Sequence, residues 1–305
     1  MANGYLFVHF TGETECGEQI YFSVSCDGLH WKDLQGGNPV LMSGIGEKGV
    51  RDPFIIKSKI DGKYIIIATD LRMANGRDWE EVQTDGSRCI VIWESENLIH
   101  WEKERMVEVG IPEAGCVWAP EAVYCEEEDS YLVFWASRVK ENNEEEPKHR
   151  IYASLTKDFY SFTEPIKYIE KENHIIDTTI VQAGEFYYRF SKDETTKNIV
   201  VDRGKDLLHG LFEPVKCEVL DNLLGVEGPE VYPLAQKGRW CLIVDRVATG
   251  KGYMPILCDD LENGAFFLLE EDAYDMGKSK KRHGSVLCIT EEEMNVLIQA
   301  YGTED

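Results

Sequence analysis

The sequence predicts an all-β fold, a five-bladed β-propeller made by residues 1–305 as a single domain. Two observations support this prediction. One unit of roughly 50 residues, with three short strands, recurs five times along the chain. The repeat is also circularly offset, because one unit takes its first strand from the C-terminus and its other two from the N-terminus. A ring closed by pairing of the N- and C-terminal segments explains this offset.

Each unit begins with a polar or acidic residue and a short apolar strand, followed by an aromatic-rich strand and by a third strand that ends in a turn of the type Ser-x-Asp-Leu-x-x-Trp. The strands are rich in Val, Ile, Tyr, Phe and Trp, as β-strands usually are. The first strands are expected at 51–56, 119–124, 177–181, 227–232 and 283–288. The second are expected at 64–71, 131–138, 187–194, 240–247 and 5–12. The third are expected at 88–101, 150–162, 198–212, 252–266 and 19–31.

Three segments fall outside the predicted strands. Residues 291–301 are expected to form either a helix or an outer strand. The acidic stretches 125–130 and 139–149 fall between predicted strands and are expected to be solvated loops. A linear pair of β-sandwich domains would not explain why the repeat continues from the end of the chain to its start.

Composition excludes several classes of partner. The chain has 32 Lys and Arg against 56 Asp and Glu, a net charge of −24. Such an excess argues against nucleic acids and anionic membrane surfaces as partners. The sequence shows neither a signal-peptide pattern nor a membrane-spanning apolar run, which favours a cytoplasmic location. The nine cysteines are odd in number and scattered, so we expect reduced thiols and no zinc site.

Polar residues occupy the start of four of the five first strands, and these are the candidates for the site: Asp52, Asp177, Glu227 and His283. Ala119 takes the fifth place. In a propeller these innermost strands line the central channel, so the residues are expected to meet around one axis. Clustered carboxylates repel one another, which keeps at least one of them protonated near neutral pH. A carboxylic acid facing a carboxylate is the arrangement that glycoside hydrolysis needs, and an inverting reaction leaves room for a water molecule between them.

Further residues are candidates for substrate binding. Phe54, Trp118 and Trp135 are expected to offer apolar faces on which a sugar ring stacks. Arg51, Arg189 and Arg246 are expected to bind sugar hydroxyls or to orient carboxylates. For Glu121 a supporting structural role is favoured over a catalytic one. The loops 72–87 and 105–118 could form the walls of a closed pocket, and the basic cluster 278–283 is expected to tether an acidic neighbour or to be solvated.

The motifs RDPFI, WAPEAVY, IDTTIV, VEGPEVY and RHGSV resemble those of glycoside hydrolase family 43, whose members are five-bladed propellers with an inverting mechanism. The resemblance implies that Asp52 is the general base, Asp177 the pKa modulator and Glu227 the general acid. It also implies that His283 lies beside a structural calcium ion in the central channel, although no cofactor is required. Two motifs depart from the family pattern, since Arg-Asp-Pro replaces Ala-Asp-Pro and Ile-Asp-Thr replaces Ile-Asp-Pro.

The function implied by this resemblance is hydrolysis of α-L-arabinofuranosyl or β-D-xylosyl linkages in oligosaccharides from plant polysaccharides such as xylan, cut from a chain end. The expected partner is therefore an oligosaccharide substrate, and the sequence makes no prediction of the oligomeric state. Two alternatives remain: a catalytically silent carbohydrate-binding propeller, and an invertase-like propeller hydrolase of other sugars.

Overall fold

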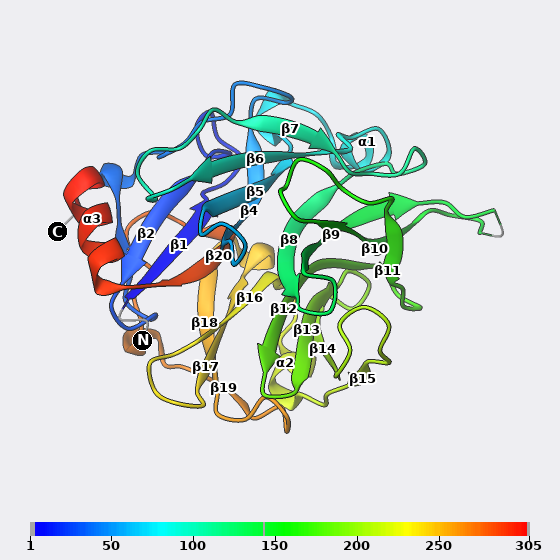
Figure 1. The fold of residues 1–305 in the computed structure, drawn as a ribbon. Helices are drawn as coiled ribbons and strands as arrows, with labels where there is room; N and C mark the ends of the chain where they lie inside the picture. Colours follow the sequence, from blue (N-terminus) through cyan, green and yellow to red (C-terminus); the bar gives the residue numbers. More distant parts are fainter. Residues whose placement is uncertain (1–3, 143, 304–305) are drawn as a thin grey trace.

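The computed structural model describes residues 4–142 and 144–303, and it contains five four-stranded antiparallel sheets arranged around a common centre (Figure 1). The innermost strands are β4 (Val50–Lys57), β8 (Trp118–Cys125), β12 (Ile175–Ala183), β16 (Glu227–Pro233) and β20 (Arg282–Ile289). The second are β5 (Tyr64–Asp70), β9 (Ser130–Val139), β13 (Phe186–Asp193), β17 (Trp240–Asp245) and β1 (Gly4–Phe10). The third are β6 (Cys89–Ser95), β10 (Lys148–Thr156), β14 (Asn198–Gly204), β18 (Tyr253–Cys258) and β2 (Tyr21–Ser25). The outer strands are β7 (Arg105–Glu108), β11 (Ile166–Ile169), β15 (Glu213–Pro214), β19 (Phe266–Leu268) and β3 (Lys32–Asp33).

Each innermost strand contacts the innermost strands of the two neighbouring sheets, so the five sheets are the blades of a closed ring. The ring is closed where β20 pairs antiparallel with β1, which places Tyr5 opposite Cys288. Segments from the two ends of the chain therefore complete one blade. The predicted five-bladed propeller and its mode of closure are confirmed.

A helix follows the closing strand. Residues 291–301 form α3 (Glu291–Tyr301), which begins with a capping box between Thr290 and Glu293. Its buried residues Met294 and Leu297 lie three positions apart and face the core, the spacing expected for one face of a helix. The helical alternative for this segment is therefore correct. Short helices occur at α1 (Trp79–Thr84) and α2 (Glu218–Asn222), and single 3-10 turns at η1 (Gln35–Gly37), η2 (Met73–Asn75), η3 (Val247–Thr249) and η4 (Glu271–Ala273).

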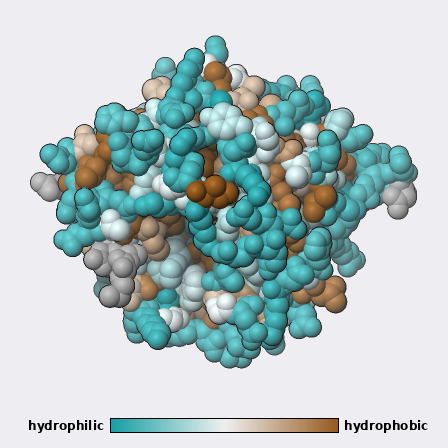
Figure 2. Space-filling view, viewed as in Figure 1, coloured by the Kyte–Doolittle hydropathy of each residue, from teal (hydrophilic) through white to brown (hydrophobic). Residues whose placement is uncertain are grey.

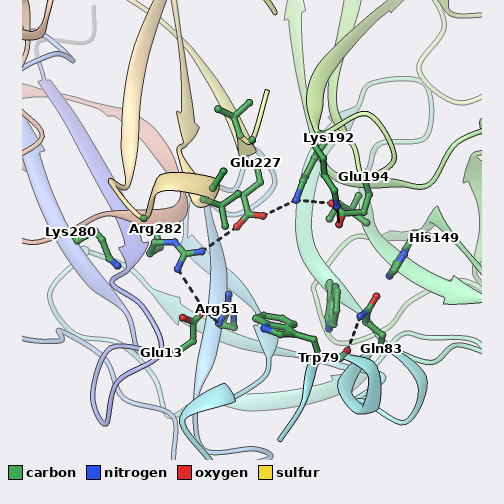
Figure 3. Close-up of a pocket in the computed structure, with 18 residues that line it drawn as sticks. Glu13, Arg51, Trp79, Gln83, His149, Lys192, Glu194, Glu227, Lys280 and Arg282 are labelled. Atoms are coloured by element: carbon green, nitrogen blue, oxygen red, sulfur yellow. Dashed lines mark hydrogen bonds and ion pairs between the residues drawn. The ribbon is translucent and has the colours of Figure 1, made fainter. Parts of the chain in front are cut away.

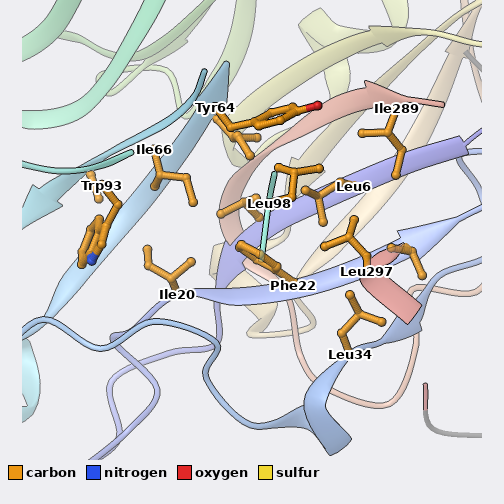
Figure 4. Packing of buried hydrophobic residues seen from close by; sticks show 14 of the residues in the cluster. Leu6, Ile20, Phe22, Leu34, Tyr64, Ile66, Trp93, Leu98, Ile289 and Leu297 are labelled. Atoms are coloured by element: carbon orange, nitrogen blue, oxygen red, sulfur yellow. The ribbon is translucent and has the colours of Figure 1, made fainter. Parts of the chain in front are cut away.

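Apolar side chains fill the spaces between neighbouring blades. Figure 4 shows one such cluster, in which Phe22 and Leu6 of one blade share a core with Ile66 of the next, and Leu297 of α3 packs against it. The face seen in Figure 2 is mostly hydrophilic, as expected for a chain of high net charge. No helix in the described part of the chain is long and apolar enough to span a bilayer. The nine cysteines are free thiols.

Every innermost strand carries an irregularity at the same point. In four blades the pairing with the second strand is interrupted directly after Arg51, Trp118, Ile176 and Glu227. In the fifth blade it is interrupted at His283, which lies between the paired residues Arg282 and Gly284. Backbone φ is positive at Asp52 (50°), Ala119 (47°), Asp177 (47°) and Gly228 (55°). The structural equivalent of Asp52 in the fourth blade is thus Gly228, so the sequence alignment of Glu227 with Asp52 was wrong by one residue. Glu227 corresponds instead to Arg51.

The bulges divide the residues at this end of the innermost strands into three rings, each with one residue from every blade. The rim ring consists of Arg51, Trp118, Ile176, Glu227 and Arg282. The middle ring is Asp52, Ala119, Asp177, Gly228 and His283. The lower ring is Phe54, Glu121, Thr179, Glu230 and Ser285.

Candidate active site

A cavity of about 750 Å³ opens at the centre of the ring, and all five residues of the rim ring line it. Asp52 and Asp177 belong to the middle ring and are not among the lining residues. Their side chains are 14% and 9% exposed, against 18% for Glu227. The structure therefore brings the three predicted catalytic carboxylates to one place, with Glu227 in the pocket wall and the two aspartates in the next ring of the channel.

Glu227 lies in a chain of ion pairs that crosses the pocket (Figure 3). Lys192 Nζ is 2.8 Å from Glu227 Oε2, and Arg282 Nη2 is 3.2 Å from Glu227 Oε1. The chain continues from Arg282 Nη1 to Glu13 Oε1 at 3.6 Å, and from Glu13 to Arg51 Nη1 at 2.9 Å. The sequence suggested acidic neighbours for Glu227, whereas the structure provides two cationic partners in direct contact.

His283 connects the two aspartates of the middle ring. Its Nδ1 lies 3.3 Å from Asp52 Oδ1 and 3.9 Å from Asp177 Oδ1. The Thr69 hydroxyl donates a hydrogen bond of 2.9 Å to Asp52 Oδ2, and the Gly228 amide donates one of 3.1 Å to Asp177 Oδ2. Asp177 thereby positions the main chain directly after Glu227, on the neighbouring blade.

The same contacts separate the protonation behaviour of the two aspartates. Burial alone would raise the pKa of Asp52, but His283 and Arg51 outweigh it and hold this pKa below its ordinary value. Burial, with repulsion from Glu227, raises the pKa of Asp177 to about 6. Burial alone would lower the pKa of His283, but Asp177 and Asp52 outweigh it and raise this pKa to about 9. At neutral pH the middle ring thus holds an imidazolium and an ionised Asp52.

Two more carboxyl groups are buried in the lower ring. The Thr179 hydroxyl donates a hydrogen bond of 3.2 Å to Glu230, which also accepts one of 2.7 Å from the Val286 amide. Burial and repulsion from Glu230 raise the pKa of Glu121 well above its ordinary value, and burial raises the pKa of Glu230 to about 8. Neither residue lines the cavity, and the supporting role expected for Glu121 stays a prediction.

Aromatic residues form another side of the pocket. The Trp118 ring meets Trp79 edge-on at 6.1 Å and stacks against His149 at 5.8 Å with an angle of 27°. Trp79 and Gln83 come from the loop 72–87, which therefore forms a wall as expected. The loop 105–118 supports this wall from behind, where Gly86 donates a main-chain hydrogen bond of 2.8 Å to the Gly115 carbonyl.

His149 presents a ring nitrogen without a partner at the pocket. Burial, with repulsion from His174, lowers the pKa of His149 to about 3, so the ring is neutral. The His149 amide donates a hydrogen bond of 3.5 Å to His174 Nδ1, and the two Nδ1 atoms lie 3.4 Å apart. His149 Nε2 is buried and has no hydrogen-bond partner among the described residues, although the side chain lines the cavity.

Four predicted substrate-binding residues do not line this pocket. Trp135 is 1% exposed and packs in the core between two blades, and Phe54 packs against the same core cluster. Arg189 is buried against the rings of Tyr168 and Phe212. These three expectations are corrected because the side chains point between blades, where apolar packing holds them. Arg246 lines a neighbouring cavity instead.

The calcium ion that the resemblance places beside His283 stays a prediction. Calcium prefers several oxygen ligands, and His283 Nδ1 lies 3.3 Å from Asp52 Oδ1 and 3.9 Å from Asp177 Oδ1. Among residues 4–142 and 144–303 no group of three or more His, Cys, Asp or Glu side chains is arranged to hold a metal ion.

Several residues that line the pocket were not predicted from the sequence. Lys192 stands opposite Ile176 in the strand register, so its place could be found only once the register was known. Glu13 and His149 lie in connections and at strand ends that carry no repeat signal. Arg282 had a signal, since it directly precedes His283 in the basic cluster. The expected tether is confirmed there, because Lys281 pairs with Asp33 and Arg282 pairs with Asp245.

Comparisons with known proteins agree with this architecture. The model of a family 43-related domain, described as "Probable glycosyl hydrolase domain", matches residues 1–295. An α-L-arabinofuranosidase of Bifidobacterium longum subsp. longum is 29% identical over 267 residues, which cover 76% of this chain and 25% of that protein. The chain thus spans about a quarter of this curated relative.

Solved structures show the same fold at low sequence identity. A family 43 protein of Bacillus licheniformis is 17% identical with a TM-score of 0.58, covering 93% of this chain and 55% of the other. An exo-β-1,3-galactanase of Phanerochaete chrysosporium is 13% identical with a TM-score of 0.54, covering 78% and 54%. With a family model that spans nearly its whole length, the chain belongs to the glycosyl hydrolases related to family 43.

Proposed function

We propose that the protein is an inverting exo-glycosidase that releases an α-L-arabinofuranosyl or β-D-xylosyl unit from the end of an oligosaccharide. One observation carries the proposal: a single pocket of about 750 Å³ has Glu227 in its wall and Asp52 and Asp177 in the adjoining ring, each from a different blade. The similarity to an arabinofuranosidase supports the choice of sugar.

In this proposal the protonated form of Glu227 gives its proton to the glycosidic oxygen while the bond between that oxygen and the anomeric carbon breaks, which leaves Glu227 as the carboxylate that Lys192 and Arg282 pair with. A water molecule attacks the anomeric carbon from the opposite side and gives its proton to Asp52, which inverts the configuration. The low pKa of Asp52 suits this role, because the carboxylate is ionised and ready to accept a proton. Asp177 acts by positioning, since it holds the amide that follows Glu227.

The charged residues that line the pocket suit recognition of a hydroxyl-rich ligand. Lys192, Arg282 and Arg51 supply charged donors, and Glu13 and Glu194 supply acceptors, within one pocket. Charged partners make the stronger hydrogen bonds to hydroxyl groups. The Trp118 wall offers the apolar surface that a sugar ring also needs, and walls on several sides support binding of a chain end.

The test is a panel of 4-nitrophenyl glycosides carrying α-L-arabinofuranose, β-D-xylose and β-D-galactose, with the product anomer followed by proton NMR. We expect release of arabinose or xylose with inversion. Retention of configuration would refute the inverting assignment. Binding of oligosaccharides without release from any glycoside would favour the silent carbohydrate-binding propeller.

A further inference from the structure

A second cavity, of about 430 Å³, lies beside the active-site pocket and is strongly basic. Five of its eleven lining residues are Lys or Arg and one is acidic. In the whole chain, 32 of 305 residues are Lys or Arg and the net charge is −24. Positive charge is thus concentrated at this cavity against the trend of the molecule, which indicates attraction for an anionic ligand.

Three of these cations keep their charge uncompensated. The guanidinium of Arg246 makes its hydrogen bonds to main-chain carbonyl groups of residues 251–253, at 3.1 to 3.4 Å. These bonds fix its orientation without supplying a counter-ion. Within the described ranges, no carboxylate lies within ion-pair distance of Arg246, Lys251 or Lys280. An anion placed here would therefore gain cations whose charge no carboxylate of the described residues already compensates.

The cavity wall is held in place by buried contacts. Asp33 accepts a hydrogen bond of 2.7 Å from the Ser279 amide and pairs with Lys281 Nζ at 2.5 Å. Trp31 donates a main-chain hydrogen bond of 2.8 Å to the Asp275 carbonyl. Asp33 compensates the charge of Lys281, and this ion pair anchors the segment that carries Lys280 to the neighbouring blade. The positions of the cavity's cations are therefore fixed by the fold.

The two cavities share one residue. Lys280 lines both, and Figure 3 shows it on the Arg282 side of the pocket. The connection between β17 and β18 separates the cavities, with Val247 facing the active site and Lys251 facing the basic cavity. This connection belongs to the blade of Glu227. Because the general acid protonates the leaving oxygen, the basic cavity adjoins the side from which the leaving group departs.

We propose that this cavity binds an anionic substituent, a carboxylate or a phosphate, on the saccharide that leaves. The inference rests on the proposed function and narrows its substrate class to glycosides whose leaving group carries a negative charge.

The test compares glucose, glucuronate and glucose 6-phosphate as competitive inhibitors of arylglycoside hydrolysis. We expect the charged sugars to inhibit at concentrations about fivefold lower or more than glucose, and the stronger of the two identifies the anion. In Lys251→Gln this preference should shrink to about twofold or less, while hydrolysis of the neutral arylglycoside is unchanged. Lys103→Gln, an exposed lysine of another blade that alters the net charge equally, is the control and should leave the preference intact.

Equal inhibition by the three sugars, or a preference that survives Lys251→Gln, would overturn the inference. Non-competitive inhibition by the charged sugars would overturn it too, because the anion would then bind apart from the leaving group. In each of these results the arylglycoside is still hydrolysed, so the proposed function stands. Absence of hydrolysis with every glycoside would instead reject the proposed function.

Discussion

Replacing Gly228 by Ala tests how tightly the bulge of the fourth blade is built. Gly228 has φ of +55°, a left-handed conformation that L side chains rarely adopt. A Cβ at this position would lie 2.7 Å from His283 Cγ, 2.9 Å from His283 Cδ2 and 2.9 Å from the Tyr253 hydroxyl oxygen. Both neighbours are buried, at 6% and 1% exposed, so neither can swing away into solvent.

The expected cost has two parts. The left-handed conformation costs an alanine about 1–2 kcal/mol. Crowding of fixed, buried side chains adds about 1–3 kcal/mol. Gly228→Ala should therefore lower the free energy of unfolding by about 2–5 kcal/mol in total. Gly238 is the matched control, because its φ is +84° and nothing lies within 4 Å of the added Cβ. Gly238→Ala should lose only the first part.

The assay is urea denaturation of both variants, followed by tryptophan fluorescence, together with steady-state kinetics. Gly228→Ala should also lose activity, because it displaces His283, which holds the pKa of the proposed base Asp52 low. Gly238→Ala should keep its activity. Equal losses of stability in the two variants would show that the middle ring relaxes around a methyl group. The argument for a rigid, close-packed centre would then fail.

Three further predictions concern the site itself. Glu227→Gln should lower kcat about 100-fold or more on xylobiose but much less on a 2,4-dinitrophenyl glycoside, because that leaving group needs no proton. Asp52→Asn should lower kcat on the two substrates to the same extent. If steady-state rates show the reverse pattern, the roles of the two residues must be exchanged. The pKa of His283 is raised to about 9 in the folded protein, against about 6.5 in the unfolded chain. Protonated His283 therefore stabilises the fold fully below about pH 6.5, and this stabilisation is lost as the pH rises through about 9. At about 1.36 kcal/mol per pH unit, the contribution to the free energy of unfolding is about 3 kcal/mol. Thermal unfolding at pH 6 and pH 10 should therefore differ more for the wild type than for His283→Gln, and equal differences would contradict this. His149→Phe keeps a ring against Trp118 but deletes Nε2, which has no hydrogen-bond partner among the described residues. If Nε2 binds a sugar hydroxyl, KM should rise about fivefold with kcat unchanged, and an unchanged KM would exclude this contact with substrate.

Much of the architecture could be predicted from the sequence, because a propeller repeats one local pattern. Each blade is a run of neighbouring antiparallel strands, so strand patterning and turn residues mark the five units along the chain. The continuation of the repeat from residue 288 to residue 5 required the ends to meet, and β20 and β1 do pair. The convergence of Asp52, Asp177 and Glu227 followed from the same symmetry.

The sequence could not reveal on which side of a bulge a residue lies. One extra residue in a strand sends the side chains that follow it to new directions, so Glu227 entered the pocket wall while Asp52 stayed in the ring below. Similarly, Trp135 and Arg189 have the chemistry of a sugar site, yet they point between blades.

Local pattern therefore determined which strands form and which unit each belongs to, since these depend on residues near one another in the chain. Only the tertiary structure decided the partners of each charge, such as Lys192 and Arg282 on Glu227, because blades far apart in sequence supply them. Charges interact through space over a few ångströms, and those distances exist only after the ring has closed.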